Sequence, residues 1–312
     1  MSYTGELNAD QEIMDGNRMV IYGAGGYGEK IYRNLAIYDK QKNVKAFIDD
    51  IKVGGVLYGI PIISIKKAVE EYGDTIICIG GETPGNIKDL ELLQGMRNIH
   101  QIVFNINCRR YGTEYGGFYL PRNFGIDHSI IYSFGIGEDL SFSEAVIEAG
   151  GVVYAFDPTP KAIKFVGDHK LFSNANFHFF PYGLSDKDGK EDFYLPKRDD
   201  WVSASVIQHH NVDNKKVIKV EMKTLRSIMR ELGHNHIDVL KMDIEGSEYK
   251  VAVNLLDPVL KPIDFQVCLM ETHERFFIPK EIEYRDELYT VMREGGFYDL
   301  YGTDKEPVFI KV

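Results

Sequence analysis

The stretch of residues 130–157, which reads IIYSFGIGEDLSFSEAVIEAGGVVYAFD, constrains the fold more than any other part of the chain. An apolar segment runs into a Gly-x-Gly turn formed by Gly135 and Gly137. An amphipathic segment follows, and then a second apolar segment that ends at Asp157. This succession predicts half of a nucleotide-binding α/β sheet. The glycines let the backbone approach a ligand, and a carboxylate at the end of the second strand can accept both hydroxyls of a ribose.

The residues after this turn narrow the choice of nucleotide. The turn continues with Glu138 and Asp139 and not with a third glycine. Two carboxylates beside the crevice would repel a diphosphate, whereas they tolerate an adenosine that carries a cationic sulfonium and an amino group. The turn therefore predicts S-adenosylmethionine as the cofactor in preference to NAD.

A second glycine-rich turn lies nearer the amino terminus. A short apolar segment at residues 19–22 leads into GAGGYG and a helical stripe, and the next apolar segment ends at Asp49 and Asp50. A third strand is expected at residues 75–81. The turn itself contains no acid, which suits a phosphate at a helix N-terminus. The alternative is a Rossmann-like domain that holds no ligand and only packs or dimerises.

Residues 19–98 resemble the amino-terminal domain of bacterial sugar N-acetyltransferases through the motifs IYGAGGYGEKIYRNL, FIDD, GGVLYGIPII and ICIGG. That domain binds a UDP-sugar, so the resemblance implies a UDP-sugar partner here. The left-handed helix repeats of the acetyltransferases are absent from the sequence, so the resemblance covers the binding module alone. By position it implies a phosphate-binding turn and an acid near the nucleoside, namely Gly23, Gly25, Gly26 and Gly28 with either Asp49 or Asp50.

Acidic residues and a histidine follow two further predicted strands. The segment IDVLKMD ends at Asp243, with Glu245 two residues later, and the segment FQVCLMETHE brings Glu271 and His273. Because the carboxyl ends of parallel strands meet at one edge of a sheet, these side chains are expected to converge with Asp157 on one crevice. Glu245 either belongs to that site or caps the following helix.

Methyl transfer to a hydroxyl is helped by a general base, and two residues are candidates. His273 is the first choice because an unperturbed imidazole titrates near pH ~6.5, and Asp243 is the second. Alternatively, His273 orders the region of Glu271 without taking a proton. Asp243, Glu271 and His273 are also compatible with Mg²⁺ or Mn²⁺, but no spacing demands a metal, so we assign no metal ligands. Four other histidines, His209, His210, His234 and His236, are expected in surface loops.

Several motifs of the carboxyl-terminal part resemble the FkbM family of S-adenosylmethionine-dependent methyltransferases: SFGIGEDLSF, AFDPTP, GLSDKDGKEDFYLP, TLRSIM and IDVLKMDIEGSEY. The resemblance spans about residues 105–312. It implies the class I methyltransferase sheet of six parallel strands and an antiparallel seventh, and methylation of hydroxyl groups, often on polyketides or sugars. By position it implies that Gly135, Gly137 and Glu138 line the methionine end of the cofactor and that Asp157 contacts the ribose. It also implies that Gly183 or Leu184 lies by the adenine and that Asp243 lies close to the reacting methyl group.

Composition sets limits on the class of protein. A chain of 312 residues is long enough for two domains, and its net charge of -11 argues against a nucleic-acid binder. No apolar run approaches the ~20 residues of a membrane helix, and the polar, acidic first residues are unlike a signal peptide, so a cytoplasmic protein is expected. The expected fold is α/β with two Rossmann-like domains, the second a class I methyltransferase sheet with a closing antiparallel hairpin. We expect an N-terminal extension, a nucleotide-binding domain and a methyltransferase domain at residues 1–18, 19–104 and 105–312.

The sequence thus predicts an S-adenosylmethionine-dependent O-methyltransferase that acts on a sugar, a nucleotide-sugar or a glycan intermediate, as in polysaccharide biosynthesis. Two other functions stay open: an NAD-linked oxidoreductase that uses the first glycine turn, and a first domain that only scaffolds the methyltransferase. Mg²⁺ is retained as an optional cofactor and a homodimer as an optional assembly. The identity of the acceptor is not encoded in any of these motifs, because acceptor pockets are built from loops.

Overall fold

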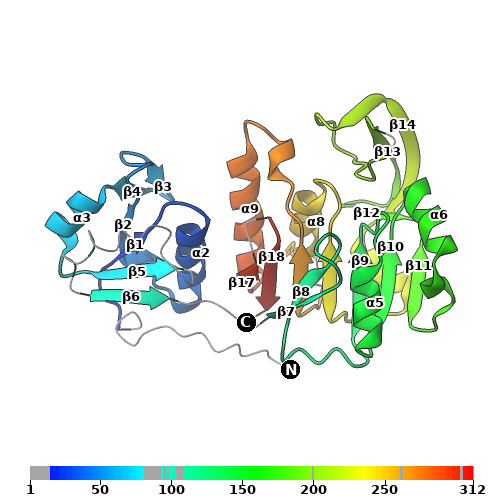
Figure 1. Ribbon diagram of the computed structural model, residues 1–312, viewed down its shortest axis with the longest axis horizontal. Helices are drawn as coiled ribbons and strands as arrows, with labels where there is room; N and C mark the ends of the chain where they lie inside the picture. The colour runs from blue at the N-terminus through cyan, green and yellow to red at the C-terminus, as the bar shows by residue number, and fades with distance from the viewer. Residues whose placement is uncertain are drawn as a thin grey trace. The chain divides into compact units, whose positions relative to one another are not determined.

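The computed structural model in Figure 1 describes residues 15–80, 93, 96, 98–102, 108–198, 200–260, 263–302 and 305–311. Its contacts divide the chain into two compact units. The first holds the described residues up to 102 together with Asp299–Tyr301, and the second holds the remaining described residues from 108 onward. Most of the predicted N-terminal extension (1–14), Gly81 at the end of a predicted strand, and the expected domain boundary near residue 104 lie outside the described residues.

The first unit is built on a six-stranded sheet in the order β3-β4-β2-β1-β5-β6. Strand β1 pairs in parallel with β2 and β5, β2 with β4, and β5 with β6, whereas β3 runs antiparallel to β4. The strands and helices are β1 (Met19–Tyr22), α2 (Gly26–Asn34), β2 (Val44–Ile48), β3 (Val56–Leu57), β4 (Ile60–Ile63), α3 (Ile65–Tyr72), β5 (Ile76–Gly80) and β6 (Asn98–Ile102). The predicted strand–turn–helix–strand arrangement is confirmed, and the short strands β3 and β6 are additions to it.

The second unit is built on a seven-stranded sheet in the order β11-β10-β9-β15-β16-β18-β17. Neighbouring strands from β11 to β16 are parallel, and β18 runs antiparallel to β16. This is the sheet that the sequence predicted, closed at one edge by β17 and β18. The strands are β9 (Ile130–Phe134), β10 (Val152–Phe156), β11 (Phe177–Phe180), β15 (Val239–Met242), β16 (Val267–Met270), β17 (Phe297–Gly302) and β18 (Pro307–Lys311).

Helices alternate with these strands, and two small sheets are added. The helices are α5 (Ser141–Glu148), α6 (Pro160–Asp168), α7 (Leu225–Leu232), α8 (Glu248–Leu255) and α9 (Glu281–Glu294). One small sheet has the order β12-β14-β13, and β7 pairs with β8 in the other. Figure 1 shows β13 and β14 as a long curved ribbon that rises beyond the edge of the large sheet. Their bounds are β7 (Cys108–Tyr111), β8 (Phe118–Pro121), β12 (Gly183–Leu184), β13 (Gly189–Pro196) and β14 (Val212–Lys223).

Burial explains why these segments form a central parallel sheet. All residues of β15 and β16 are buried, as expected of strands covered on both faces. Tyr132, Phe134 and Phe156 pack in the core between the strands and the helices. Strand β9 is flanked by β10 on one side and by β15 on the other, so the chain order reverses there. In open α/β sheets ligands bind outside the carboxyl ends of the strands at such a reversal.

Among the residues that the structure describes, no helix combines the length and the apolar character needed to cross a bilayer.

Candidate functional site

A cavity of about 230 Å³ opens at the carboxyl ends of β9, β10, β15 and β16. This is the reversal point of the sheet, where the sequence placed the ligand. The site residues predicted from the sequence of the second domain all line the cavity, except His273, which lies behind it. They are Gly135, Gly137, Glu138, Asp157, Gly183, Leu184, Asp243 and Glu245, and Glu271 joins them.

The turn after β9 is packed tightly against the residue that follows β15. Gly135 has φ +77°, and a Cβ atom there would lie 1.7 Å from the carbonyl oxygen of Asp243. Gly137 also has a positive φ of +54°. The buried Lys241 stabilises the turn, because its Nζ donates hydrogen bonds to the carbonyl oxygens of Gly135 at 2.7 Å and Phe134 at 3.2 Å. A glycine is therefore required at position 135 for both conformational and steric reasons.

Asp157 holds the same turn from the other side. Its side chain is 4% exposed, and Oδ2 accepts hydrogen bonds from the backbone N–H groups of Ile136 and Gly137, each at 2.9 Å. Oδ1 accepts from the backbone N–H of Thr159 at 2.9 Å and from its hydroxyl at 2.6 Å. These four bonds occupy the carboxylate's acceptor positions, so a ribose hydroxyl can bind Asp157 only by replacing one of them. Burial raises the pKa of Asp157, and the hydrogen bonds from Thr159, Gly137 and Ile136 act in the opposite direction.

The charge of the cavity is strongly negative. Six of the lining residues are acidic and two, Lys241 and Arg275, are basic. One of the acids, Asp139, is engaged in the fold, because its Oδ1 accepts the backbone N–H of Ser141 at the start of α5 at 2.7 Å. The surplus of carboxylates disfavours a diphosphate ligand and favours a cationic one. The acidic lining residues are Glu138, Asp139, Asp157, Asp243, Glu245 and Glu271.

An apolar wall completes the cavity on the side of β10 and β12. Leu184 is buried there, and a Cβ atom at Gly183 would lie 2.5 Å from the sulfur of Met222. Phe156 and Phe193 line the same cavity. Apolar side chains at this place suit the face of a purine ring, which is where the sequence resemblance placed the adenine.

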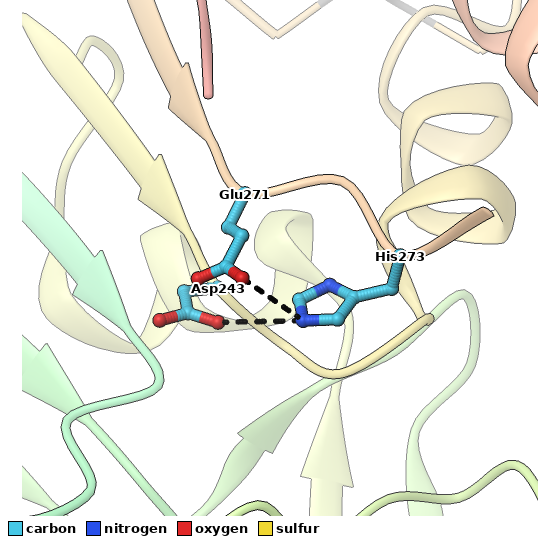
Figure 2. A group of neighbouring side chains, drawn as sticks. All are labelled: Asp243, Glu271 and His273. Carbon is cyan, nitrogen blue, oxygen red and sulfur yellow. Dashed lines mark ion pairs between the residues drawn. The ribbon is translucent and has the colours of Figure 1, made fainter. Parts of the chain in front are cut away.

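Behind the acidic end of the cavity, His273 faces a group of carboxylates. Its ring is 1% exposed, and Nε2 lies 3.4 Å from Glu245 Oε2, 3.7 Å from Glu271 Oε1 and 4.0 Å from Asp243 Oδ1. Figure 2 shows the side chains of Asp243 and Glu271 side by side, both directed at this nitrogen. On the other side of the ring, Nδ1 lies 3.0 Å from Glu248 Oε1.

The carboxylates change the protonation of the histidine. Burial by itself lowers the pKa of His273, but the charge of Glu248, the hydrogen bond to it, and the charges of Glu245 and Asp243 outweigh burial and raise this pKa to about 10. The ordinary imidazole pKa near ~6.5, on which the choice of His273 as base rested, therefore does not apply to this ring. The raised pKa favours the protonated ring at neutral pH, which argues against His273 as the general base and for its alternative role of ordering the region of Glu271.

The pKa values of two neighbouring carboxyl groups are raised as well. Burial, followed by the charge of Asp243, raises the pKa of Glu271 to about 7. Burial is also the main cause of the raised pKa of Glu245. The backbone of Glu245 has a positive φ of +50°. The helix-capping alternative for Glu245 is not what the structure shows. It is Glu248 that reaches back to accept the backbone N–H groups of Ile244 at 2.9 Å and Gly246 at 3.0 Å.

Sequence reasoning missed Glu248 and Lys241, and it placed His209 differently. Glu248 and Lys241 are fully buried charges, and their type and spacing alone gave no sign of their contacts. The sequence allowed Tyr115 either to cover a cofactor or to pack between domains; it lies on the loop between β7 and β8 and lines the cavity. His209 was expected in a surface loop; instead its half-buried ring stacks on Phe276 with centroids 3.6 Å apart.

The glycine turn of the first unit has the predicted backbone. Gly23 has φ +89°, Gly25 caps α2, Gly26 begins it, and a Cβ atom at Gly28 would lie 1.9 Å from the carbonyl oxygen of Gly23. The acid after β2 is engaged with the turn, because Asp49 Oδ2 accepts the backbone N–H of Ala24 at 3.1 Å. Lys52 Nζ donates to the carbonyl oxygen of Ala24 at 2.6 Å, which brings a positive charge to the turn.

Similar proteins are known for part of this chain. Residues 129–298 match the model of the methyltransferase FkbM domain. The probable methyltransferase-like protein 24 of Homo sapiens is 32% identical over 162 residues, which cover 49% of this chain and 37% of that protein. The Rattus norvegicus protein of the same description is 34% identical over 162 residues, 49% of this chain and 38% of its own length. The chain therefore matches less than two fifths of the length of these relatives.

Among solved structures, the Methanococcus jannaschii fibrillarin pre-rRNA processing protein is similar to this chain with a TM-score of 0.36 and 14% sequence identity. The matched region covers 61% of this chain and 70% of the fibrillarin chain. Similarity at that level supports no inference about this chain. The family match is of a different kind, because it covers more than half of the 312 residues and includes every strand from β9 to β16. The chain belongs to the methyltransferase FkbM family.

Proposed function

We propose that the chain is an S-adenosylmethionine-dependent O-methyltransferase whose acceptor is a hydroxyl of a sugar, a nucleotide-sugar or a glycan intermediate. One observation carries the proposal: in a chain of the methyltransferase FkbM family, the cavity at the reversal point of the sheet is lined by six acidic and two basic residues. A cavity of that charge favours a cationic adenosine derivative over a diphosphate nucleotide.

The residues of the cavity fit S-adenosylmethionine. The closely packed turn at Gly135 and Gly137 lets a ligand approach the backbone, and Glu138 offers a carboxylate to the amino group of the methionine moiety. Phe156 and Leu184 offer apolar contact to the adenine. Asp157 keeps the turn in its conformation, and its contact to the ribose remains part of the proposal.

When bound, S-adenosylmethionine supplies a methyl group on a positively charged sulfur, which leaves as a neutral thioether when the acceptor oxygen bonds to the methyl carbon. The protein's part is to exclude water, to align the acceptor and to receive its proton. We assign the proton to Glu245, because it lines the cavity and burial raises its pKa toward neutrality, which makes it a stronger base. Asp243, the second choice from the sequence, is beside it.

The acceptor end of the cavity supports a hydroxylated substrate. Glu245 and Glu271 offer acceptors for hydroxyl protons, Arg275 lies 3.7 Å from Glu271, and the ring of Tyr115 stands at the mouth, where a sugar ring can pack on it. A cytoplasmic location and a role in polysaccharide assembly belong to the same proposal.

Calorimetric titration with S-adenosylhomocysteine tests the cofactor. We expect one site per chain of about micromolar affinity, which is about -8 kcal/mol. The site should be lost in Asp157→Ala and kept in Asp168→Ala, an exposed acid in α6. Circular dichroism verifies that both variants are folded. A folded wild-type protein that gives no heat with S-adenosylhomocysteine but binds NADH would refute the proposal.

For the first unit, we propose a nucleotide-sugar site at the turn of Gly23, Gly25, Gly26 and Gly28. Support comes from Lys52, whose charge at the turn suits a diphosphate. Titration with UDP-N-acetylglucosamine should show binding that Lys52→Met weakens at least ~10-fold and that Asp157→Ala leaves unchanged, since loss of one phosphate contact costs of the order of 1.4 kcal/mol. Absence of binding to the wild-type chain would leave the first unit with a packing or scaffolding role.

A further inference from the structure

We propose that Asp243, Glu271 and His273 bind a divalent metal ion of the Mn²⁺ type at the acceptor end of the cavity. The three residues come from different places: Asp243 follows β15, Glu271 follows β16, and His273 lies two residues beyond it. Their ligand atoms nevertheless lie within 4.8 Å of one another (Figure 2).

The distances between these atoms suit ligands of one ion. His273 Nε2 lies 3.7 Å from Glu271 Oε1 and 4.0 Å from Asp243 Oδ1. Ligands bound at ~2.1 Å are about 3 Å apart when they are neighbours in an octahedron and about 4.2 Å apart when they are opposite. The observed separations fall between these limits. They are also too long for direct hydrogen bonds, so the atoms face one another across a small space.

The histidine is the most buried of the three residues, and its ring is directed at the other two. The ring is 1% exposed, and Nε2 lies at the ion-pair distances given above from Glu245, Glu271 and Asp243. The ring is oriented from behind by Glu248, which is 0% exposed and lies 3.0 Å from Nδ1. A carboxylate that fixes one ring nitrogen and aims the other at a ligand group is the usual outer support of a metal-binding histidine.

Glu248 is itself held in place. Its two oxygens accept the backbone N–H groups of Ile244 and Gly246, in the segment that links Asp243 to α8. The carboxylate of Glu248 thus orients both His273 and the loop that follows Asp243. This support is what a preformed coordination site requires, since ligand geometry must be set before the ion arrives.

The ligand set selects the kind of ion. An ion bound to His273 Nε2 displaces the proton that this nitrogen carries in the metal-free chain, so binding strengthens as the pH rises. Two carboxylates suit Mg²⁺ and Mn²⁺, and an imidazole suits the transition metals, so Mn²⁺ satisfies both preferences. The described residues near the group offer no thiolate, which would favour Zn²⁺. Mg²⁺ is expected to bind more weakly because one of its ligands would be a nitrogen.

The position of the ion suggests a role in binding the acceptor. Asp243 and Glu271 line the cavity, and three protein ligands leave coordination positions open for water or substrate oxygens. An ion there would take two neighbouring oxygens of the acceptor, so we infer an acceptor with a vicinal diol or a hydroxyl beside a carbonyl. This acceptor class rests on the proposed function, whereas the ion site itself does not.

Electron paramagnetic resonance of Mn²⁺ tests the site directly. The full chain is treated with a chelator, dialysed and titrated with Mn²⁺, and the signal of the free ion is measured. We expect one site per chain whose affinity falls at least ~10-fold in Glu271→Gln and in Asp243→Asn. The control is Glu283→Gln, an exposed glutamate in α9 that should bind like the wild type.

Circular dichroism of the ion-free variants separates loss of the site from loss of the fold. Glu271 is suited to the test, because its side chain is 32% exposed and Gln has the same shape. Competition with Mg²⁺ and Zn²⁺ ranks the ions. Absence of a Mn²⁺ site in the folded wild-type protein, or equal affinity in Glu271→Gln, overturns the proposal and leaves the group as a network of charge pairs around His273.

A parallel titration with S-adenosylhomocysteine separates this proposal from the proposed function. Binding of S-adenosylhomocysteine without Mn²⁺ binding would overturn the metal site and leave the methyltransferase. Mn²⁺ binding without S-adenosylhomocysteine binding would support the metal site and refute the methyltransferase.

Discussion

A hydrogen bond of 2.9 Å from the backbone N–H of Gly137 to Oδ2 of Asp157 ties the turn after β9 to the end of β10. The acid that a nucleotide-binding sheet places beside the ribose here accepts hydrogen bonds from the backbone of the glycine turn. Asp49 makes the corresponding bond to Ala24 in the first unit, at 3.1 Å. In both units, therefore, the acid after the second strand stabilises the backbone of the glycine turn.

The first prediction concerns Asp157→Asn. The amide NH₂ cannot accept a hydrogen bond, so either the pair of bonds from Ile136 and Gly137 or the pair from Thr159 is lost. We expect the free energy of unfolding to fall by about 1–3 kcal/mol, measured by urea denaturation. Hydrogen exchange at the Ile136 and Gly137 amides should accelerate. Unchanged exchange combined with weaker S-adenosylhomocysteine binding would instead assign Asp157 to the ribose.

The second prediction compares two glycines. Gly135→Ala adds a Cβ atom 1.7 Å from the Asp243 carbonyl oxygen at a positive φ, so we expect a loss of at least about 2 kcal/mol and of S-adenosylhomocysteine binding. Gly167→Ala is the matched control. Gly167 lies in α6 with nothing within 4 Å of the added atom, and alanine should stabilise the helix by up to ~1 kcal/mol. Equal melting temperatures of the two variants would contradict the tight packing of the turn.

Much of this site was predictable because it follows from the order of strands. The apolar segments before Gly135, Asp157 and Asp243 identified three neighbouring strands, and parallel strands bring their carboxyl ends to one edge. The role of Asp157 was not predictable in the same way, because the sequence does not give the distances between its carboxylate and the backbone N–H groups of the turn.

The protonation of His273 could not be predicted from the sequence, for a related reason. A pKa depends on every charge within a few ångströms, and Glu248 is as close to the ring as it is only because the segment before α8 folds back on itself. The signal that existed was Glu248 in the first turn of α8, where a carboxylate often accepts free backbone N–H groups. His209 shows the same limit, since its partner Phe276 lies 67 residues away in the sequence.

The third prediction concerns the stability of the chelator-treated protein above neutral pH. The pKa of His273 is about 10 in the folded chain and near the ordinary 6.5 when unfolded, so the folded state binds more protons between these values. Its contribution to stability is complete below about pH 6.5 and is lost as the pH rises toward 10. Glu248→Gln removes the closest charge, so the fall in melting temperature between pH 7 and 10 should be shallower than in the wild type. Parallel curves for the two proteins would contradict the ion pair.

The fourth prediction concerns His209 at acidic pH. Burial, followed by the charges of His210, His273 and Arg275, lowers its pKa from 6.5 to about 4, and its Nε2 is buried without a hydrogen bond. The unfolded chain therefore binds more protons than the folded chain between pH 6.5 and 4, so the contribution of His209 to stability is lost as the pH falls through that range. His209→Phe keeps an aromatic ring against Phe276 and does not titrate. The difference in melting temperature between variant and wild type should therefore shift in favour of the variant from pH 7 to pH 4, as calorimetry can measure. If the difference stays constant over this range, the ring is accessible to protons in the folded state and the stacked arrangement is wrong.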